Sequence, residues 1–218
     1  MQNRFKKIWV EYKSLLIFLI LMIAFRSAVA DYSLVPTGSM QPTIVEGDVI
    51  LVNKLAYDLR FPLTHKSLIK LNEPERGDII VFDSKVSDLR LVKRVIGIPG
   101  DTLEMNANQL IINGINQKYH YDKELNYKTE IDLTEDLMGL EHSIRLMPYR
   151  SGRTNFGPIK VPDNYYFAMG DSRDNSADSR MIGFIPRNEI IGRTRRTLLS
   201  IDLDQYFNPR FDRLLHQL

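Results

Sequence analysis

The 218-residue sequence contains no cysteine, and this absence removes several kinds of chemistry at once. Without thiols the chain cannot form a disulfide, use a cysteine nucleophile or build a cysteine-ligated zinc site. Histidine is scarce as well: the four residues stand at positions 65, 120, 142 and 216, with no pair at the short spacing of a helical metal motif. We therefore expect no metal and no cofactor, although sequence distance alone leaves a histidine-based catalytic triad open.

The chain also lacks an excess of charge of one sign. Lysine and arginine total 29 against 27 aspartate and glutamate residues, and the net charge of +2 is too weak to predict a nucleic-acid partner. The densest basic cluster, Arg193, Arg195 and Arg196, is typical of a solvated surface. With 44% hydrophobic and 26% charged residues, the composition is that of a globular chain with one main core and room for a smaller appended unit.

Long hydrophobic runs are scarce: the longest, from Leu15 to Phe25, falls short of the roughly 20 residues that a membrane-spanning helix needs. A cleavable signal peptide would end at the small-residue site Ala28-Val29-Ala30. An uncleaved anchor helix at residues 14–32 would let the Arg26 side chain reach the interface. Both interpretations stay open, beside the less specific one of a buried core helix. Both also leave residues 1–13 in the cytoplasm, with the basic residues Arg4, Lys6, Lys7 and Lys13.

The rest of the chain, residues 33–218, is expected to form an extracytoplasmic domain rich in β-strands. Short apolar runs alternate with Gly, Pro and Asp breaks, and Asn113-Gly114 is a strong hairpin signal. Many short strands with such breaks predict a closed or folded-over antiparallel barrel. Residues 116–160 are more polar and predict a small insertion, with a short helix over 132–140. The end of the chain, 206–218, predicts a short amphipathic helix or a frayed tail.

Ser39 lies within the segment from Val35 to Thr43, in which two prolines bracket a Thr-Gly-Ser turn. Proline fixes φ and glycine permits unusual φ, so the backbone here is bent and stiff. Such a turn suits a nucleophile, because the hydroxyl and the neighbouring N–H groups are held ready. Taken alone, the segment also fits an ordinary surface loop.

Lys93 lies in the apolar run from Leu91 to Ile96. In a strand it would share one face with Leu91 and Val95, while Arg94 would lie on the other face. Whichever face points inward, a basic side chain is held among apolar neighbours, and burial favours the neutral form of a lysine. A neutral lysine can take the proton of a serine. A basic side chain that reaches solvent from a sheet edge is the alternative.

Residues 170–180 are dense in short hydrogen-bonding side chains and follow an apolar run directly. A calcium loop counted from Asp174 would need glycine at its sixth position and glutamate at its twelfth, where the chain has Ser179 and Ile185. We interpret the segment as a polar network that fixes a nearby catalytic group. A plain surface loop stays open as the alternative.

Taken together and in this order after an N-terminal apolar segment, these stretches resemble the bacterial type I signal peptidases. The resemblance covers most of the chain except about 116–160 and the tail. It rests on five motifs: Pro-Thr-Gly-Ser-Met-Gln-Pro-Thr at 36–43, Gly-Asp-Val-Ile-Leu-Val at 47–52, Arg-Gly-Asp-Ile-Ile-Val-Phe at 76–82, Val-Lys-Arg-Val-Ile-Gly-Ile-Pro-Gly-Asp at 92–101, and Gly-Asp-Ser-Arg-Asp-Asn-Ser-Ala-Asp-Ser-Arg at 170–180.

The resemblance implies a mainly β, antiparallel barrel-like catalytic fold with a small insertion and an N-terminal transmembrane helix. It also implies a catalytic dyad of Ser39, the nucleophile, and Lys93, the general base. The Ser39 N–H and the Thr37 hydroxyl match oxyanion-hole donors, and Ser176 matches a serine that orients the lysine. Other positions match supporting or pocket-lining roles: Asp178 and Arg180 as an ion pair, and Val35, Met40, Ile44, Ile50, Leu91 and Val92 as walls of pockets for small residues.

The implied partners are the signal peptides of preproteins and the lipid bilayer, with no nucleic acid and no metal. The implied location is the inner membrane, with one pass, a cytoplasmic N-terminus and the catalytic domain on the outer side. Three rivals stay open: a peptidase dedicated to a few substrates, a self-cleaving Ser-Lys repressor-type protease, and an anchored β-rich binding module without catalysis. If the dyad exists, Ser39 Oγ and Lys93 Nζ should lie about 3 Å apart.

Overall fold

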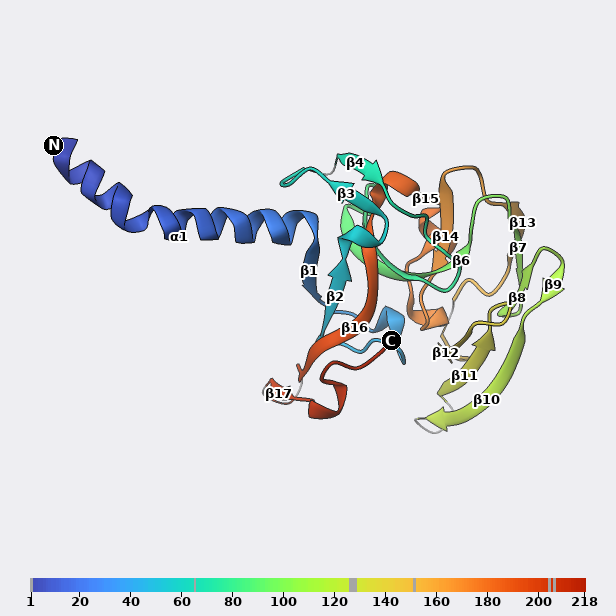
Figure 1. Ribbon diagram of the computed structural model, residues 1–218. Coiled ribbons are helices and arrows are strands. Elements are labelled where there is room, and N and C mark those ends of the chain that lie inside the picture. The colour runs from blue at the N-terminus through green and yellow to red at the C-terminus, as the bar shows by residue number, and fades with distance from the viewer. Residues whose placement is uncertain (1, 65, 126–128, 151, 204, 206) are drawn as a thin grey trace.

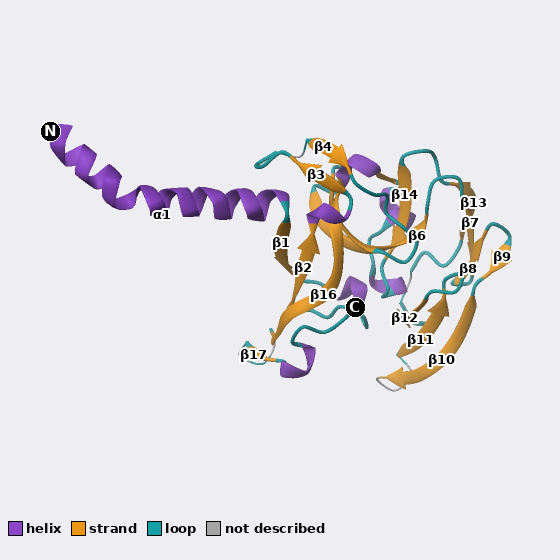
Figure 2. Ribbon diagram, in the orientation of Figure 1, coloured by secondary structure: helices purple, strands orange, loops and turns teal. Residues whose placement is uncertain are grey.

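The computed structural model describes residues 2–64, 66–125, 129–150, 152–203, 205 and 207–218. A long N-terminal helix, α1 (Gln2–Ala28), extends away from a body built mostly of strands (Figure 1). The other helices are single short turns (Figure 2). The mainly β, antiparallel class expected from the sequence is therefore confirmed.

The main sheet has the strand order β1-β2-β16-β5-β6-β14-β15, with β17 paired beside β16, and its neighbouring strands are antiparallel. Among the described residues no ladder joins the end strands β1 and β15, so the sheet stays open and, of the closed or folded-over barrel expected, the closed form is wrong. The strands are β1 (Ala30–Leu34), β2 (Asp48–Asn53), β5 (Ile79–Ser84), β6 (Leu89–Gly97), β14 (Tyr165–Met169), β15 (Ile185–Pro186), β16 (Ile190–Asp202) and β17 (Asn208–Pro209).

Two smaller units flank this sheet. A four-stranded sheet has the order β13-β7-β8-β9, and a two-stranded ribbon pairs β3 with β4. The hairpin expected at Asn113-Gly114 joins β8 to β9, and both turn residues have the positive φ that this turn requires, 53° and 79°. These strands are β3 (Asp58–Arg60), β4 (Ser67–Lys70), β7 (Thr102–Asn106), β8 (Gln109–Ile112), β9 (Ile115–Asn116) and β13 (Phe156–Lys160).

The polar stretch after β9 forms a separate three-stranded sheet of β10 (Lys118–Leu125), β11 (Glu130–Asp136) and β12 (Glu141–Leu146). The helix expected over 132–140 is wrong, because β11 is paired on both sides, with β10 and with β12. Its carboxylates Asp132 and Glu135 are buried against Arg145 and Arg173. Ion pairs to distant residues thus set the conformation of a segment whose own pattern is weak.

The short helical turns are η1 (Gly38–Met40), η2 (Lys54–Ala56), η4 (Arg173–Asn175), α2 (Ser179–Ile182), η5 (Arg187–Glu189) and η6 (Phe211–Arg213). The described part of the tail is neither an amphipathic helix nor frayed; Tyr206 lies outside the described residues. After η6 the last residues run along β16, where Thr197 N–H donates to His216 O at 2.9 Å and Leu218 N–H donates to Arg195 O at 3.0 Å.

The predicted anchor at 14–32 differs from the structure at its end. The helix stops at Ala28, and the backbone from Ala30 to Leu34 is paired with β2 instead. Among the residues that the structure describes, no helix combines the length and the apolarity that crossing a membrane requires.

The core that carries the site lies on both faces of β5. Ile79 and Val81 pack with Met40 and Ile44 on one face, while Ile80 and Phe82 belong to a second cluster on the other. Burial on both faces explains why this strand is continuously apolar rather than alternating. β6 pairs with β5 from Leu89 to Arg94 and with β14 from Arg94 to Gly97, so its central residues are also enclosed.

Candidate active site

Ser39 lies in η1, where the chain makes one tight turn between Pro36 and Pro42. The turn is closed by the Gln41 N–H, which donates to Gly38 O at 3.1 Å. The Met40 side chain is fully buried in the core, whereas Ser39 is only partly buried. The core therefore anchors the turn and leaves Ser39 partly exposed.

Lys93, from β6, reaches this serine. Its Nζ lies 2.7 Å from Ser39 Oγ and also donates to Val92 O at 2.9 Å. The residue is only 2% exposed. Burial lowers the pKa of Lys93 from 10.5 to about 8; the Asp178 and Asp171 carboxylates oppose this shift, and Arg180 adds to it. At pH 7, roughly a tenth of the molecules then carry a neutral lysine.

The loop after β14 encloses the Ser39 turn from the other side. Ser172 N–H donates to Ser39 O at 3.1 Å. A Cβ at Gly170 would collide with Ser39 O and the Ser176 hydroxyl, so only glycine allows this approach. Gly170 N–H in turn donates to Asp178 Oδ2 at 3.0 Å. The polar network expected at residues 170–180 is thus built around the backbone of Ser39.

Asp178 and Arg180 form a buried ion pair at 2.7 Å. Burial works against ionisation, but the hydrogen bond and charge of Arg180 hold the pKa of Asp178 below its ordinary value. Arg180 also donates to Arg173 O at 2.6 Å and to Arg153 O at 3.1 Å. The pair closes the loop on itself and places a carboxylate near Lys93.

Two of the expected roles find a different geometry. The Ser176 hydroxyl does not bond to Lys93; the Val92 carbonyl takes the second place on Nζ. Ser176 Oγ is buried and has no hydrogen bond of regular geometry, although the hydroxyl contributes to lowering the pKa of Asp178. Thr37 is the exposed N-terminal cap residue of η1, and its side chain makes no capping hydrogen bond.

The expected pocket walls divide into two groups. Met40, Ile44 and Ile50 have no exposed surface, so they support the site from below rather than line an open pocket. Val35, 4% exposed, belongs to the same cluster, and the half-buried Val92 packs against it. Leu91, also half-buried, packs against the cluster on the other face.

A second buried ion pair was not assigned from the sequence. Arg94, next to Lys93 but on the opposite face of β6, binds Asp171 through two hydrogen bonds of 2.9 and 2.8 Å. Thr43 Oγ1 donates to the same carboxylate at 2.6 Å. Burial opposes ionisation, yet the Arg94 charge holds the pKa of Asp171 below its ordinary value. The signal was present: a basic residue on each face of a strand that is buried on both faces.

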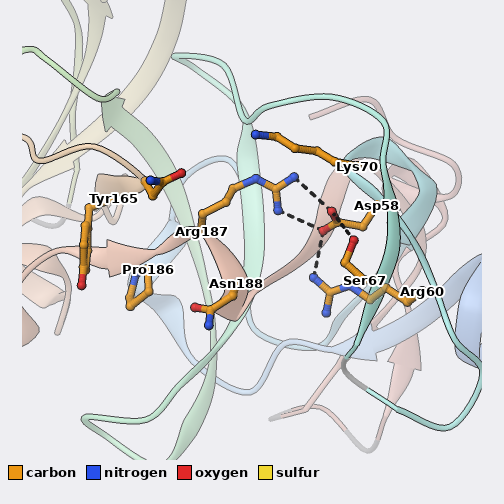
Figure 3. A pocket seen from close by; sticks show the side chains of 9 residues that line it. Asp58, Arg60, Ser67, Lys70, Tyr165, Pro186, Arg187 and Asn188 are labelled. Atoms are coloured by element: carbon orange, nitrogen blue, oxygen red, sulfur yellow. Dashed lines mark hydrogen bonds and ion pairs between the residues drawn. The ribbon is translucent and has the colours of Figure 1, made fainter.

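The cavity of about 500 Å³ shown in Figure 3 lies elsewhere. Arg187 and Arg60 approach the Asp58 carboxylate from different directions there, at 2.9 and 3.2 Å. The Arg187–Asp58 pair fastens the β3–β4 ribbon to η5, while the Arg60–Asp58 pair lies within β3. None of the lining residues belongs to η1 or β6, so this hollow is distinct from the Ser39–Lys93 site. Across the described part of the chain, no group of three or more His, Asp or Glu side chains could hold a metal ion.

Comparisons with known proteins identify relatives of this chain. The family model described as "Signal peptidase, peptidase S26" matches residues 8–199. Signal peptidase I of Pseudomonas fluorescens is 36% identical over 207 residues, which cover 88% of this chain and 72% of that protein. Signal peptidase I of Buchnera aphidicola subsp. Schizaphis graminum is 33% identical over 219 residues, with coverages of 81% and 70%.

Among solved structures, a signal peptidase I from Enterococcus faecalis V583 is 29% identical and covers 57% of this chain and 98% of that one. Its TM-score of 0.37 is too low to support an argument about the fold. The family assignment therefore rests on the family model, which spans most of the chain, and on the two bacterial relatives. The chain belongs to the signal peptidase family, peptidase S26.

Proposed function

We propose that this chain is a serine endopeptidase that removes signal peptides from exported preproteins, with Ser39 as nucleophile and Lys93 as general base. The observation that carries the proposal is the 2.7 Å contact between Lys93 Nζ and Ser39 Oγ. The pKa of about 8 adds to it, because a lysine must be neutral to accept a proton. Membership of the signal peptidase family supports the substrate class.

The reaction follows from this geometry. Neutral Lys93 takes the hydroxyl proton of Ser39 while Oγ attacks the scissile carbonyl carbon, which leaves a tetrahedral oxyanion and a lysine ammonium. The ammonium then protonates the leaving amine as the peptide C–N bond breaks, and an ester to Ser39 remains. Water, activated by the again neutral lysine, attacks this ester and releases the signal peptide with a free carboxylate.

The oxyanion is assigned to the Ser39 N–H and the Thr37 hydroxyl. The first N–H groups of a helical turn have no partner inside the turn, and Ser39 lies at the start of η1. The Thr37 side chain makes no capping bond and lies two residues before the nucleophile. Removing one such donor typically lowers kcat by about 100- to 1000-fold.

The substrate is assigned as a peptide with small residues before the cut. Leu91 and Val92 in β6 are the assigned walls with the most exposed surface, since they are only half-buried, whereas Val35 is buried. Met40, Ile44 and Ile50 lie behind them and limit how deep a side chain can enter. A shallow apolar floor of this kind favours alanine over larger side chains.

We also propose a location: although α1 does not combine the length and apolarity of an ordinary spanning helix, its exposed apolar stretch anchors the chain in the inner membrane, with the basic end in the cytoplasm and the catalytic body outside. The apolar residues from Leu15 to Ile23 are between 39% and 62% exposed, so they lack protein cover. Retention of the chain in alkali-washed membranes, with protease access only from outside, is the expected result. A chain recovered in the alkaline supernatant would remove the anchor and leave the dyad standing.

The function is tested by incubating the purified full chain with several unrelated preproteins and identifying the new N-termini by mass spectrometry. Wild type should cut after small residues. Ser39→Ala and Lys93→Ala should abolish cutting while the circular dichroism spectrum stays unchanged. Cleavage by either variant near the wild-type rate would refute the dyad, and cleavage of only one preprotein would point to a dedicated peptidase.

A further inference from the structure

Arg145 belongs to β12, in the polar stretch for which the sequence indicated no role. Its backbone meets the loop that encloses the nucleophile: Arg145 N–H donates to Asp171 O at 2.8 Å, and the residue forms an isolated parallel bridge with Ser172. Ser172 N–H donates to Ser39 O. Only two backbone hydrogen bonds and one peptide link therefore separate Arg145 from the carbonyl of the nucleophile.

The Arg145 side chain makes a second connection. Its Nε and Nη2 bind the two oxygens of Asp132 at 2.7 and 3.0 Å, and Nη1 lies 3.3 Å from Glu130. The same Nη1 donates to Gln41 Oε1 at 3.0 Å. Asp132 is 3% exposed, so a buried carboxylate of the β10–β11–β12 sheet holds the guanidinium in place. A planar guanidinium fixed at two points presents its remaining donors in one direction only.

Gln41 carries this constraint to the turn. Its side-chain amide lies over Gly38, where a Cβ would come within 3.1 Å of both Gln41 Cδ and Nε2. Its backbone N–H closes the turn on Gly38 O. Because Ser39 lies between these two residues, Gln41 restrains the turn that presents the hydroxyl, through its backbone N–H and through its side chain over Gly38.

We propose that Arg145 is a positioning residue for the peptidase reaction. Through Gln41 on one side and Asp171 and Ser172 on the other, it holds the Ser39 turn at its distance from Lys93. The sheet of β10, β11 and β12 is then part of the catalytic scaffold rather than an appendage. This inference rests on the proposed function, because it concerns the rate of attack by Ser39.

Positioning of the Ser39 turn by Arg145 can be separated from a role limited to docking the β10–β11–β12 sheet. A buried ion pair between Arg173 and Glu135, 1% and 0% exposed, joins the same sheet to the same loop without Arg145. Tyr119 OH donates to that glutamate at 2.6 Å. Truncating the Arg145 side chain therefore leaves the sheet attached and releases the Gln41 amide.

The test is a double-mutant cycle on the full chain with Arg145→Ala, Gln41→Ala and both together, assayed for kcat and KM on one preprotein. Each single variant should lose about 10-fold in kcat with little change in KM, as expected for one charge-assisted hydrogen bond. The double variant should be no slower than the worse single one, because both changes cut the same link. Arg150→Ala, an exposed arginine five positions on, should match wild type.

Other outcomes overturn the inference. If Gln41→Ala keeps full kcat, or if the losses in kcat of the two single variants multiply in the double variant, Arg145 only docks the β10–β11–β12 sheet and does not position Ser39. If Arg145→Ala does not fold, Gln41→Ala decides alone, since Gln41 lies outside the sheet. If wild type cuts no preprotein, the proposed function fails separately. The rate at which a penem-type probe acylates Ser39 then gives the readout, and equal rates in wild type and Gln41→Ala would end the proposal.

Discussion

The pH dependence of cleavage is the sharpest test of the role of Lys93. The pKa of Lys93 lies near 8 because burial lowers it from 10.5. If the neutral amine is the base, kcat/KM follows the neutral fraction: about 1% at pH 6, a tenth at pH 7 and half at pH 8. The rate should therefore rise about 10-fold from pH 6 to 7, about 5-fold from 7 to 8, and then level off. At pH 7 the neutral fraction is about 300-fold larger than for a lysine of ordinary pKa.

A charge change shifts this profile in a known direction. The Asp178 carboxylate is the largest electrostatic contribution that raises the pKa of Lys93, and Arg180 lowers it. Asp178→Asn removes the negative charge and leaves Arg180 unpaired, so both effects lower the pKa and the midpoint moves to lower pH. The assay measures kcat/KM on one preprotein in a constant-ionic-strength buffer from pH 5.5 to 10. A change of about one pH unit in the midpoint is the size of shift that the assay must resolve.

The control is Arg150→Ala, which should keep the wild-type midpoint because Arg150 is exposed and absent from the groups that act on Lys93. A profile that stays flat between pH 6 and 9, or a midpoint close to 10.5, would refute a buried neutral base. A midpoint that rises in Asp178→Asn would refute the electrostatic reasoning while leaving the dyad itself in place.

Three further predictions concern stability and packing. Lys93→Met should abolish cleavage but stabilise the fold at pH 7 by up to about 3 kcal/mol. Below pH 8 the lysine of wild type is protonated in the folded and in the unfolded state, and the folded state buries this charge. In urea unfolding, the gain in stability should fade as the pH rises towards 10.5. Gly170→Ala should slow acylation by the penem-type probe, since the new Cβ meets the Ser39 carbonyl oxygen and the Ser176 side chain. Asp171→Asn should cost about 3–5 kcal/mol in urea unfolding by leaving buried Arg94 without its counter-charge.

Each of these has its own contrary result. A Lys93→Met variant that is less stable than wild type at pH 7 would show that the lysine is not a burial cost. Wild-type acylation in Gly170→Ala would mean that the loop yields easily. An unchanged unfolding midpoint in Asp171→Asn would show that water replaces the carboxylate at Arg94.

Much of the site was readable from the sequence because its signals are local. The prolines and glycine around Ser39 define the turn, and strand alternation puts Lys93 and Arg94 on opposite faces. The Asn113-Gly114 hairpin and the antiparallel strands followed from turn chemistry and short apolar runs. Local backbone preference and periodicity are properties of neighbouring residues, so they survive without knowledge of the fold.

The misassigned elements depend on partners far along the chain. The sequence predicts a helix over 132–140, but residues 130–136 form a strand. The buried carboxylates of this strand meet arginines that the local pattern cannot show, and one of them, Arg173, is 38 residues from Glu135. The open sheet likewise depends on which strands fail to pair. Tertiary contacts override weak local preference in each case.

The sequence by itself determined the residue types, the stiff turn and the alternation that make a Ser-Lys dyad conceivable. Only the tertiary structure decided that Ser39 and Lys93, 54 residues apart, meet at 2.7 Å. It also decided that Lys93 is 2% exposed, and therefore that its pKa falls to a value at which a proton can be taken near neutral pH. Distance and desolvation are properties of the packed chain, because both depend on residues that adjoin only after folding.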